Sequence, residues 1–406
     1  MNPSNQPLKG TRVLDFSRLI AGPMAAMILS DLGAEVVKVE APEGDEARRY
    51  GDDLAGGNSG LFLTYNRNKR SVVLDLRQPK AQELALRLAT RCDVLIQNFR
   101  PGVMQRLGLG NDVVRRDNPG VIYCSISGYG QTGPDWQLPA FEAVLQAAGG
   151  VMSINGEEGG RPVRLGAPLA DCTAGVFAAL SIVTALYARR DDGQGRYLDI
   201  SLLEGQLALM SPFIVEHLLT GIVPVPLGTT SQYQAPSGVF PSAAGELMIM
   251  VGEGAWPAFC RALHLEHLLA DPRFASNRLR IAHRKALAAE IEPVFRGKTA
   301  AEWLALLRQH GIPCGPVNSV DQVVRDPQVI ARRAITEVSH PAYGPLPQVG
   351  PVAWRIWPAE QDPPMQPPPL LGEHTAEVLR EYLGLSDTTL GALQREGIIQ
   401  GPGGIS

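Results

Sequence analysis

The amino-acid sequence predicts an α/β protein with a mostly parallel sheet covered by helices, followed by a smaller α+β domain. Three observations support this prediction. Apolar runs of strand length alternate with helical patterns over the first 130 residues. Two stretches rich in Pro interrupt the later chain. The 406 residues are also enough for two or three domains.

The N-terminal part begins with one βαβ unit. RVLDF (12–16) has the pattern of a buried strand, the helical AAMILSDLG ends at Gly33, and EVVKVE (35–40) is the next strand. Further strands are expected at 71–76, 93–99 and 121–127, with a helix from Pro79. Parallel sheets of this kind bind ligands beyond the carboxyl ends of their strands. The loops in which we expect a site are therefore 17–23, 41–50, 77–79 and 98–102.

The remaining chain predicts four segments. The large domain continues through a long apolar helix (172–190) to about residue 220, and residues 221–242 form a linker rich in Pro, Gly and Ser. The smaller domain covers 243–325, with a strand at 246–252 and helices near 255–263, 282–295 and 299–310. Residues 326–406 contain a second Pro-rich crossing (341–369) and two C-terminal helices, and they are expected to return to the large domain.

The composition of the chain argues against several classes of partner and location. The net charge of −4 gives no broad attraction to phosphate backbones, so we expect no nucleic-acid partner. The five cysteines are scattered, which favours free thiols and a reducing, cytoplasmic location. The N-terminus lacks the apolar core of a signal peptide, and the stretch VFAALSIVTALYA is too short to span a bilayer. No membrane partner is expected.

Two motifs suggest cofactors, and neither is convincing. GYGQTG (128–133) fits the dinucleotide pattern, but Pro134 follows where a helix would have to begin, so a turn is predicted. His264 and His267 have helical spacing without an obvious third ligand, so no metal site is predicted. We expect no permanently bound cofactor.

Asp171 stands at the start of the long apolar helix, in LADCTAG. Asp is a preferred N-cap, whose carboxylate accepts hydrogen bonds from helix amides. A carboxylate held in this way would stay ionised and fixed in direction, as a nucleophile requires. The structural and the catalytic interpretations are compatible.

The segments around these features resemble the class III CoA-transferases, the CaiB/BaiF family of formyl-CoA and carnitine CoA-transferases. The resemblance is carried, in order, by GTRVLDFSRLIAGP, LSDLGAEVVKVEAPEGDEARR, NRNKRSVVLDLR, CDVLIQNFRPGVMQRLGL, NPGVIYCSISGYGQTGP, LADCTAGVFAAL, GQGRYLDISLLEG, DPRFASNRLR, GIPCGPVNSVDQVVRDPQV and PPPLLGEHTAEVLREYLG. It covers nearly the whole chain, and it implies that Asp171 is the catalytic nucleophile.

The resemblance also implies an architecture and a ligand. The N- and C-terminal parts would form one Rossmann-like domain, and each ring-shaped chain would interlock with a second copy in a homodimer. The substrates would be coenzyme A thioesters. The implied CoA contacts are Leu19, Ile20, Ala21, Leu74, Arg77, Asn98, Phe99 and Arg106.

The chain departs from its relatives at three places. Phe141 stands where racemases of the family carry a proton-transferring His, and Ile20 stands where oxalate-specific transferases carry Gln. The glycine-rich loop of those transferases is represented by Gly252 and Gly254, separated by Glu253. Glu142 matches a family Glu near the nucleophile and is expected to support it by hydrogen bonding.

The resulting hypothesis is a transferase that moves CoA from an acyl-CoA to a free carboxylic acid through an aspartyl anhydride and an aspartyl-CoA thioester. Arg48 and Arg49 follow a predicted strand and are candidates for binding a second carboxylate, so a short dicarboxylate such as succinate, itaconate or mesaconate is the expected acid. An acyl-CoA racemase or epimerase and a non-catalytic CoA-binding protein are the alternatives.

Overall fold

The structure, a computed structural model, describes residues 6–51, 54, 58–350 and 365–402. Contacts divide the chain into two units: unit 1 combines 1–150, 165–215 and 331–406, and unit 2 combines 151–164 and 216–330. The sequence boundaries differ from these units, because unit 2 also contains 151–164 and the expected linker 221–242. Composition marks a Pro-rich segment but does not show which body the segment packs against.

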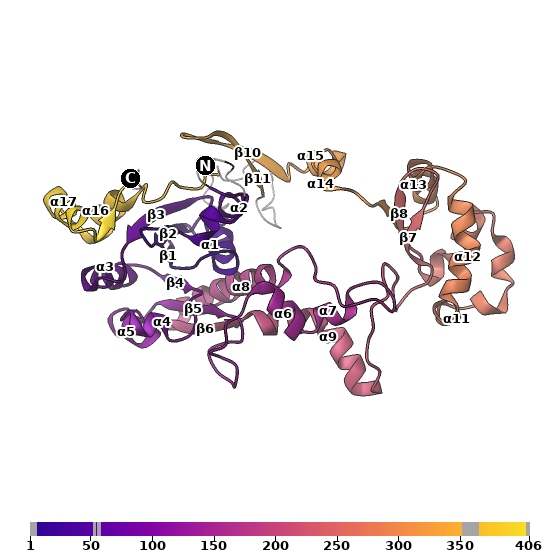
Figure 1. Ribbon diagram of the computed structural model, residues 1–406, viewed down its shortest axis with the longest axis horizontal. Helices are drawn as coiled ribbons and strands as arrows, with labels where there is room; N and C mark the ends of the chain where they lie inside the picture. The colour runs from indigo at the N-terminus through magenta and orange to yellow at the C-terminus, as the bar shows by residue number, and fades with distance from the viewer. Residues whose placement is uncertain (1–5, 52–53, 55–57, 351–364, 403–406) are drawn as a thin grey trace. The chain divides into compact units, whose positions relative to one another are not determined.

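A seven-stranded sheet forms the centre of unit 1, in the order β12-β3-β2-β1-β4-β5-β6 (Figure 1). Strands β1 to β6 are parallel and only the edge strand β12 runs antiparallel, against β3. The predicted α/β class with a mostly parallel sheet is therefore confirmed. The strands are β1 (Arg12–Asp15), β2 (Glu35–Glu40), β3 (Lys69–Leu74), β4 (Val94–Gln97), β5 (Ile122–Ser127), β6 (Arg196–Ser201) and β12 (Ile399–Gln400).

The central strands are apolar on both faces because helices cover both. Val13 and its parallel partner Val36 belong to one buried cluster, and their neighbours Leu14 and Val37 belong to another on the opposite face. Helices α1 and α8 supply the first cluster, and α3 and α16 supply the second. The helices of unit 1 are α1 (Ala21–Asp31), η2 (Glu46–Arg49), α2 (Gly60–Tyr65), α3 (Pro79–Ala89), α4 (Val103–Arg106), α5 (Asn111–Asp117), α6 (Glu142–Ala148), α8 (Leu169–Asp192), α16 (Thr375–Leu383), α17 (Asp387–Arg395) and most of α9 (Leu202–Thr220).

The C-terminal segment returns to the large sheet. Helix α16 packs beside β3 and α3, and β12 pairs with β3. Part of the expected Pro-rich crossing is regular structure, because β10 (Ile335–His340) and β11 (Gly344–Val349) form an antiparallel hairpin. The later part of that crossing includes 351–364, which lies outside the described residues.

Helix α8 is longer than the apolar stretch suggested and, by length and composition alone, could cross a membrane. Its buried side consists of small residues such as Ala174, Gly175 and Ala178, which lets it pack closely on α1. A Cβ on Gly175 would lie 2.8 Å from the carbonyl oxygen of Ala21. This close contact is typical of a core helix in a folded domain.

Unit 2 contains a three-stranded antiparallel sheet, β7-β8-β9, packed on helices around Phe259, Phe274 and Phe295. Strand β7 begins inside the segment predicted as a linker. The elements are α7 (Val151–Ile154), β7 (Ser237–Pro241), β8 (Glu246–Met250), η3 (Glu253–Ala255), α10 (Trp256–Ala262), η4 (Glu266–Leu269), η5 (Pro272–Phe274), α11 (Asn277–Ala282), α12 (Arg284–Phe295), α13 (Ala300–Gln309), β9 (Cys314–Pro316), α14 (Val320–Val323) and α15 (Pro327–Ala331).

We predict that Gly175→Leu lowers the free energy of unfolding by about 1–3 kcal/mol, because the added side chain overpacks the contact between α1 and α8. Gly391→Leu is the matched control. Gly391 also lies inside a helix, but a Cβ there meets nothing closer than the end of Arg395 at 3.6 Å. Urea unfolding of both variants measures the difference. Equal stability of the two variants would contradict the close packing.

Candidate active site

The site lies at the carboxyl edge of the large sheet, where the strand order reverses between β1 and β4. Two pockets of about 220 and 280 Å³ occupy this edge. We call them the β2 pocket and the Asp171 pocket. Arg18 and Phe99 line both, and the Arg18 guanidinium carbon lies 4.7 Å from the centre of the Phe99 ring. One extended ligand placed across this stacked pair would reach both pockets.

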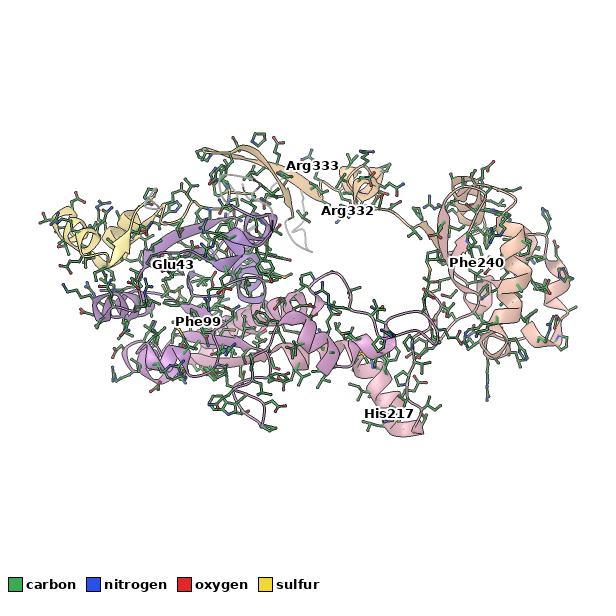
Figure 2. The ribbon with its side chains drawn as sticks, viewed as in Figure 1. Glu43, Phe99, His217, Phe240, Arg332 and Arg333 are labelled. Atoms are coloured by element: carbon green, nitrogen blue, oxygen red, sulfur yellow. The ribbon has the colours of Figure 1, made fainter. Side chains whose placement is uncertain are left out.

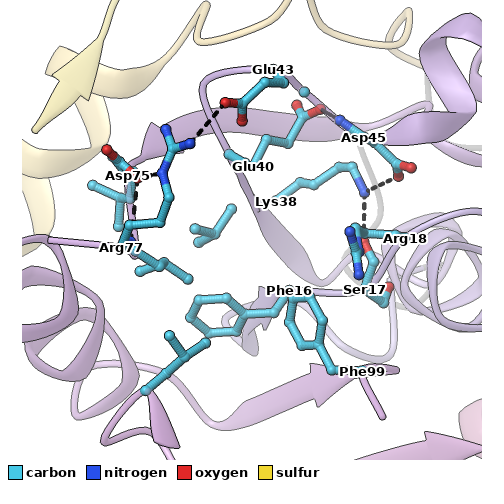
Figure 3. A pocket seen from close by; sticks show the side chains of 16 residues that line it. Phe16, Ser17, Arg18, Lys38, Glu40, Glu43, Asp45, Asp75, Arg77 and Phe99 are labelled. Atoms are coloured by element: carbon cyan, nitrogen blue, oxygen red, sulfur yellow. Dashed lines mark hydrogen bonds and ion pairs between the residues drawn. The ribbon is translucent and has the colours of Figure 1, made fainter. Parts of the chain in front are cut away.

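The β2 pocket contains three of the expected CoA contacts: Leu74, Arg77 and Phe99 (Figure 3). Arg77 is exposed, and its guanidinium contacts Asp75 at 2.6 Å and Glu43 at 3.2 Å. Figure 2 labels Glu43 and Phe99, which both line this pocket. Arg106 is exposed at the end of α4 and lines neither pocket. In this structure Arg106 is therefore separate from the other expected contacts.

The Asp171 pocket brings together most of the remaining candidates, although they come from four separate stretches of sequence. They are Leu19, Ile20, Ala21, Asn98, Phe99, Phe141, Glu142 and Asp171. The side chain of Asn98 is occupied by the neighbouring loop: it accepts a hydrogen bond from Arg18 N at 2.8 Å and donates one to Arg18 O at 2.7 Å. Asn98 thus holds the loop that follows β1.

Asp171 lies in the first turn of α8 and is not its N-cap, which is Pro168 without a side-chain cap bond. The prediction of an Asp171 cap is therefore wrong. Burial and the nearby Glu142 charge raise the pKa of Asp171 to about 7. This carboxyl is thus not held ionised by helix amides, as the sequence suggested. Near neutral pH it exchanges between the protonated and ionised forms.

Glu142 takes the capping role that was expected of Asp171. Its Oε1 accepts a hydrogen bond from Ala170 N at 3.3 Å and another from Gln146 Nε2 at 2.6 Å. The buried side-chain amide of Gln146 also makes two hydrogen bonds to the backbone of Leu165. Its Oε1 accepts from Leu165 N at 2.9 Å, and its Nε2 donates to Leu165 O at 3.1 Å. Glu142 and Gln146 therefore hold the segment that leads into α8. The i, i+4 spacing of Glu142 and Gln146 on a helix could have indicated this hydrogen bond, but Gln146 was not among the residues predicted from the sequence.

Three buried ion pairs involve strands β1 to β3, and Lys38, Glu40 and Asp45 of these pairs line the β2 pocket. Lys69 pairs with Asp15 at 3.0 Å, Lys38 with Asp45 at 2.8 Å, and Arg48 with Glu40 at 2.7 Å. Burial alone would lower the pKa of Lys38, but the charges of Asp45, Asp15 and Glu40 outweigh it and raise that pKa. Sequence patterns did not reveal these pairs, because Lys69 and Asp15 lie on separate strands and the other two pairs form only when the segment after β2 folds back on that strand.

The structure contradicts the expected role of Arg48 as a free cation for a substrate. Its Nε and Nη2 bond both oxygens of Glu40, and its Nη1 bonds Asn58 and the Pro369 carbonyl. The guanidinium also lies 3.7 Å from the centre of the Phe62 ring. A guanidinium enclosed in this way is structural, since it has already paired with a carboxylate. Arg49 is exposed and lines neither pocket.

Tyr65 and Cys172 form a neutral pair beside Asp171, with the Tyr65 hydroxyl 3.7 Å from Cys172 Sγ. Burial raises the pKa of both groups, and the Asp171 charge adds to the effect. Neither group therefore brings a charge to the site at neutral pH. Tyr65 is distant in sequence from Asp171, and no local pattern indicated it.

Gly252 and Gly254 belong to unit 2, where Gly252 precedes the short helix η3. Glu253 between them accepts hydrogen bonds from Asn277 N at 2.7 Å and from Arg280 Nη2 at 2.6 Å. These bonds tie the loop to α11. Within the described ranges, no group of three or more His, Cys, Asp or Glu side chains could hold a metal ion. Residues 128–141 contain no helix: GYGQTG is a series of bends, and the turn follows it at 134–137.

We predict that Asp171→Asn stabilises the fold, and increasingly so as pH rises from about 4 to 7. The pKa of Asp171 is higher in the folded state than in the unfolded state, so ionisation of Asp171 destabilises the wild-type fold progressively as pH rises through this window. Asparagine does not ionise, so the variant avoids this loss. The gain at pH 8 is about 1.4 kcal/mol for each pKa unit by which folding raises the value. Urea unfolding at pH 4, 6 and 8 measures it. A gain that does not grow with pH would show that Asp171 ionises normally.

The chain matches the family model described as "CoA-transferase family III" over residues 8–375. It is 35% identical to human succinyl-CoA:glutarate CoA-transferase over 397 residues, which cover 97% of this chain and 90% of that protein. It is 37% identical to acetyl-CoA:oxalate CoA-transferase of Acetobacter aceti over 332 residues, covering 81% of this chain and 85% of that protein.

A solved structure of a CaiB/BaiF family protein from Brucella suis has the same fold. The two chains superpose with a TM-score of 0.82 and are 33% identical, with 93% of this chain and all of the other covered. The resemblance inferred from sequence segments is thereby confirmed along nearly the whole chain. This protein is a CoA-transferase of family III.

Proposed function

We propose that the enzyme moves CoA from an acyl-CoA thioester to a free carboxylic acid, with Asp171 as the covalent nucleophile. The observation that supports this most directly is the place of Asp171. It lies in a pocket of about 280 Å³ that shares Arg18 and Phe99 with a second pocket lined by Arg77. A CoA thioester has the matching form, with an anionic nucleotide at one end and a reactive carbonyl at the other.

The first half of the proposed reaction loads the enzyme with CoA. An ionised oxygen of Asp171 attacks the thioester carbonyl carbon, the C–S bond breaks, and CoA leaves as a thiolate while a mixed anhydride forms. The thiolate then attacks Cγ of Asp171. The anhydride C–O bond breaks, the donor acid leaves as a carboxylate, and an aspartyl-CoA thioester remains.

The second half repeats these steps in reverse order with a new acid. The acceptor carboxylate attacks Cγ of Asp171 and expels the CoA thiolate, which attacks the acceptor's acyl carbon and frees Asp171. One thioester replaces another, so the exchange is close to thermoneutral. Anhydrides hydrolyse readily, so the site must limit water. The neutral Tyr65–Cys172 pair and the apolar core behind α8 support such an environment.

We propose a short dicarboxylate, such as succinate, itaconate or mesaconate, as one of the acids. Relatives are named for succinyl-CoA and glutarate, and another for oxalate. Arg48 is buried and engaged by Glu40, whereas Arg18 and Arg100 are exposed and line the Asp171 pocket. Arg18 also pairs with Glu46 at 3.2 Å, but both side chains are exposed, and such solvent-exposed pairs contribute little energy. Either guanidinium can pair with a second carboxylate. Phe141 also lines this pocket and has no proton to transfer, which disfavours racemase chemistry at that position.

We also propose that the chain acts as an interlocked homodimer of ring-shaped subunits in the cytoplasm. Several large apolar side chains of α8 and α9 are exposed in the single chain, as a surface covered by a second copy would be. They are Val176, Phe177, Leu180, Tyr187, Leu218 and Leu219. The five cysteines are all free thiols, which suits a reducing compartment.

We predict that Asp171→Asn reduces transfer by more than about 1,000-fold, because an amide cannot form the anhydride. CoA binding should remain within a few-fold of the wild type, as measured by calorimetry. Intact-mass spectrometry of wild-type enzyme incubated with succinyl-CoA should show a CoA adduct that is absent from the variant. Asp117→Asn, an exposed carboxylate on α5, is the control. Near wild-type turnover by Asp171→Asn would rule out this nucleophile.

We predict that Arg18→Gln raises the KM for a dicarboxylate roughly 10-fold, since one charge-assisted hydrogen bond is lost. The KM for a monocarboxylate of equal length should change much less. Arg49→Gln is the matched control, because Arg49 is exposed but outside both pockets. Steady-state kinetics with paired acids separates the two effects. An equal rise for both acids would exclude Arg18 as the partner of the second carboxylate.

A further inference from the structure

Leu19 has an unusual backbone conformation at the centre of the site. Its φ angle is 66°, in the left-handed region that favours Gly and Asn over a branched side chain. It lies in the loop between β1 and α1, and it lines the Asp171 pocket. A strained residue of this kind persists only where its surroundings hold it in place.

One buried ion pair holds the loop at Leu19 and at Ser17. Asp45 Oδ1 accepts a hydrogen bond from Leu19 N at 3.1 Å, and its Oδ2 accepts one from Lys38 Nζ at 2.8 Å. Lys38 Nζ also donates to Ser17 O at 2.8 Å. The side chains of Lys38 and Asp45 are fully buried. The ion pair therefore fixes the backbone of this loop from beneath.

Asp45 also links this loop to the next one along the sheet edge. Its Oδ1 accepts a second hydrogen bond from Ala47 N at 2.9 Å, and its own N donates to Glu40 Oε2 at 3.0 Å. Ser17 and Arg18 line the β2 pocket, whereas Leu19 and Ile20 line the Asp171 pocket. A change in the loop at Leu19 would thus alter both pockets at once.

We propose that Asp45, paired with Lys38, is a positioning residue of the site: it holds Leu19 in the left-handed conformation that shapes the two pockets for one CoA thioester. This inference deepens the proposed function and depends on it for the ligand. Asp45 has no place in the bond-making steps. It acts on the substrate only through the backbone of residues 17–19.

The test is a rescue experiment. Asp45→Ala removes the acceptor of Leu19 N, and a second substitution, Leu19→Gly, removes the steric cost of the left-handed φ. Leu19→Ala in the same background is the matched control, because it shortens the side chain but keeps the Cβ that makes this φ unfavourable. CoA dissociation constants by calorimetry, KM, kcat and melting temperature are measured for each folded variant.

We expect Asp45→Ala to weaken CoA binding and raise the KM of the acyl-CoA by about 10-fold or more, as displacement of positioning groups does. Leu19 itself lines the Asp171 pocket, so each double variant is compared with the same Leu19 substitution in the wild-type background. On that comparison Leu19→Gly should restore most of the loss, and Leu19→Ala should not. A purely structural role would lower the melting temperature without changing the binding of the folded fraction. Wild-type CoA affinity in folded Asp45→Ala, or equal rescue by both Leu19 substitutions, would overturn the proposal.

If Asp45→Ala does not fold, the same comparison is made with Asp45→Asn. Asparagine retains an acceptor for Leu19 N but removes the charge that holds Lys38, so the expected loss of affinity is smaller and the order of rescue is unchanged. Wild-type affinity in this variant, or equal rescue by both Leu19 substitutions, would overturn the proposal. A wild-type enzyme that binds CoA but transfers it to no acid would refute the proposed function, while the effect of Asp45 on CoA binding would still decide the positioning role.

Discussion

The buried ion pairs at the carboxyl edge of the sheet are the constraint on which the site depends. Each of β1, β2 and β3 contributes charged side chains that are almost fully buried: Asp15, Lys38 with Glu40, and Lys69. Removing one partner of such a pair leaves an uncompensated charge, which costs about 3–5 kcal/mol. The strands must therefore align in one register, and that register fixes the loops that follow them.

The pKa of Asp171, the proposed nucleophile, follows from its burial and from the nearby Glu142. Burial disfavours the charged form of a carboxyl group, and a second carboxylate nearby adds to that effect. Glu142 has Gln146 and Ala170 N as donors, and the pKa of Asp171 rises to about 7. A carboxyl group with this pKa is partly ionised at neutral pH, and its anion is more reactive than an ordinary carboxylate because its surroundings stabilise it less, which suits the proposed role of Asp171 as nucleophile.

Packing connects these two features. Helix α1 begins immediately after the loop that the Lys38–Asp45 pair holds, and α8 carries Asp171 in its first turn. Gly175 allows the two helices to approach within contact of backbone atoms. Small residues at this interface therefore set the distance between the loop at Leu19 and Asp171. The apolar content of α8 serves this packing on its inner side and leaves an exposed apolar surface on its outer side.

Local patterns in the sequence were enough to predict strands β1 to β5 and a mostly parallel sheet, because apolar periodicity and turn residues are local properties. The resemblance to the family also singled out Asp171 and Glu142, which line one pocket in the structure. Only the tertiary structure showed that Arg48 is enclosed by Glu40, that Glu142 caps α8 in place of Asp171, and that Asp45 holds Leu19. These outcomes depend on which groups meet once strands, helices and loops have packed together. Burial and neighbouring charge, which decide whether a side chain is free, paired or neutral, exist only after the chain has folded.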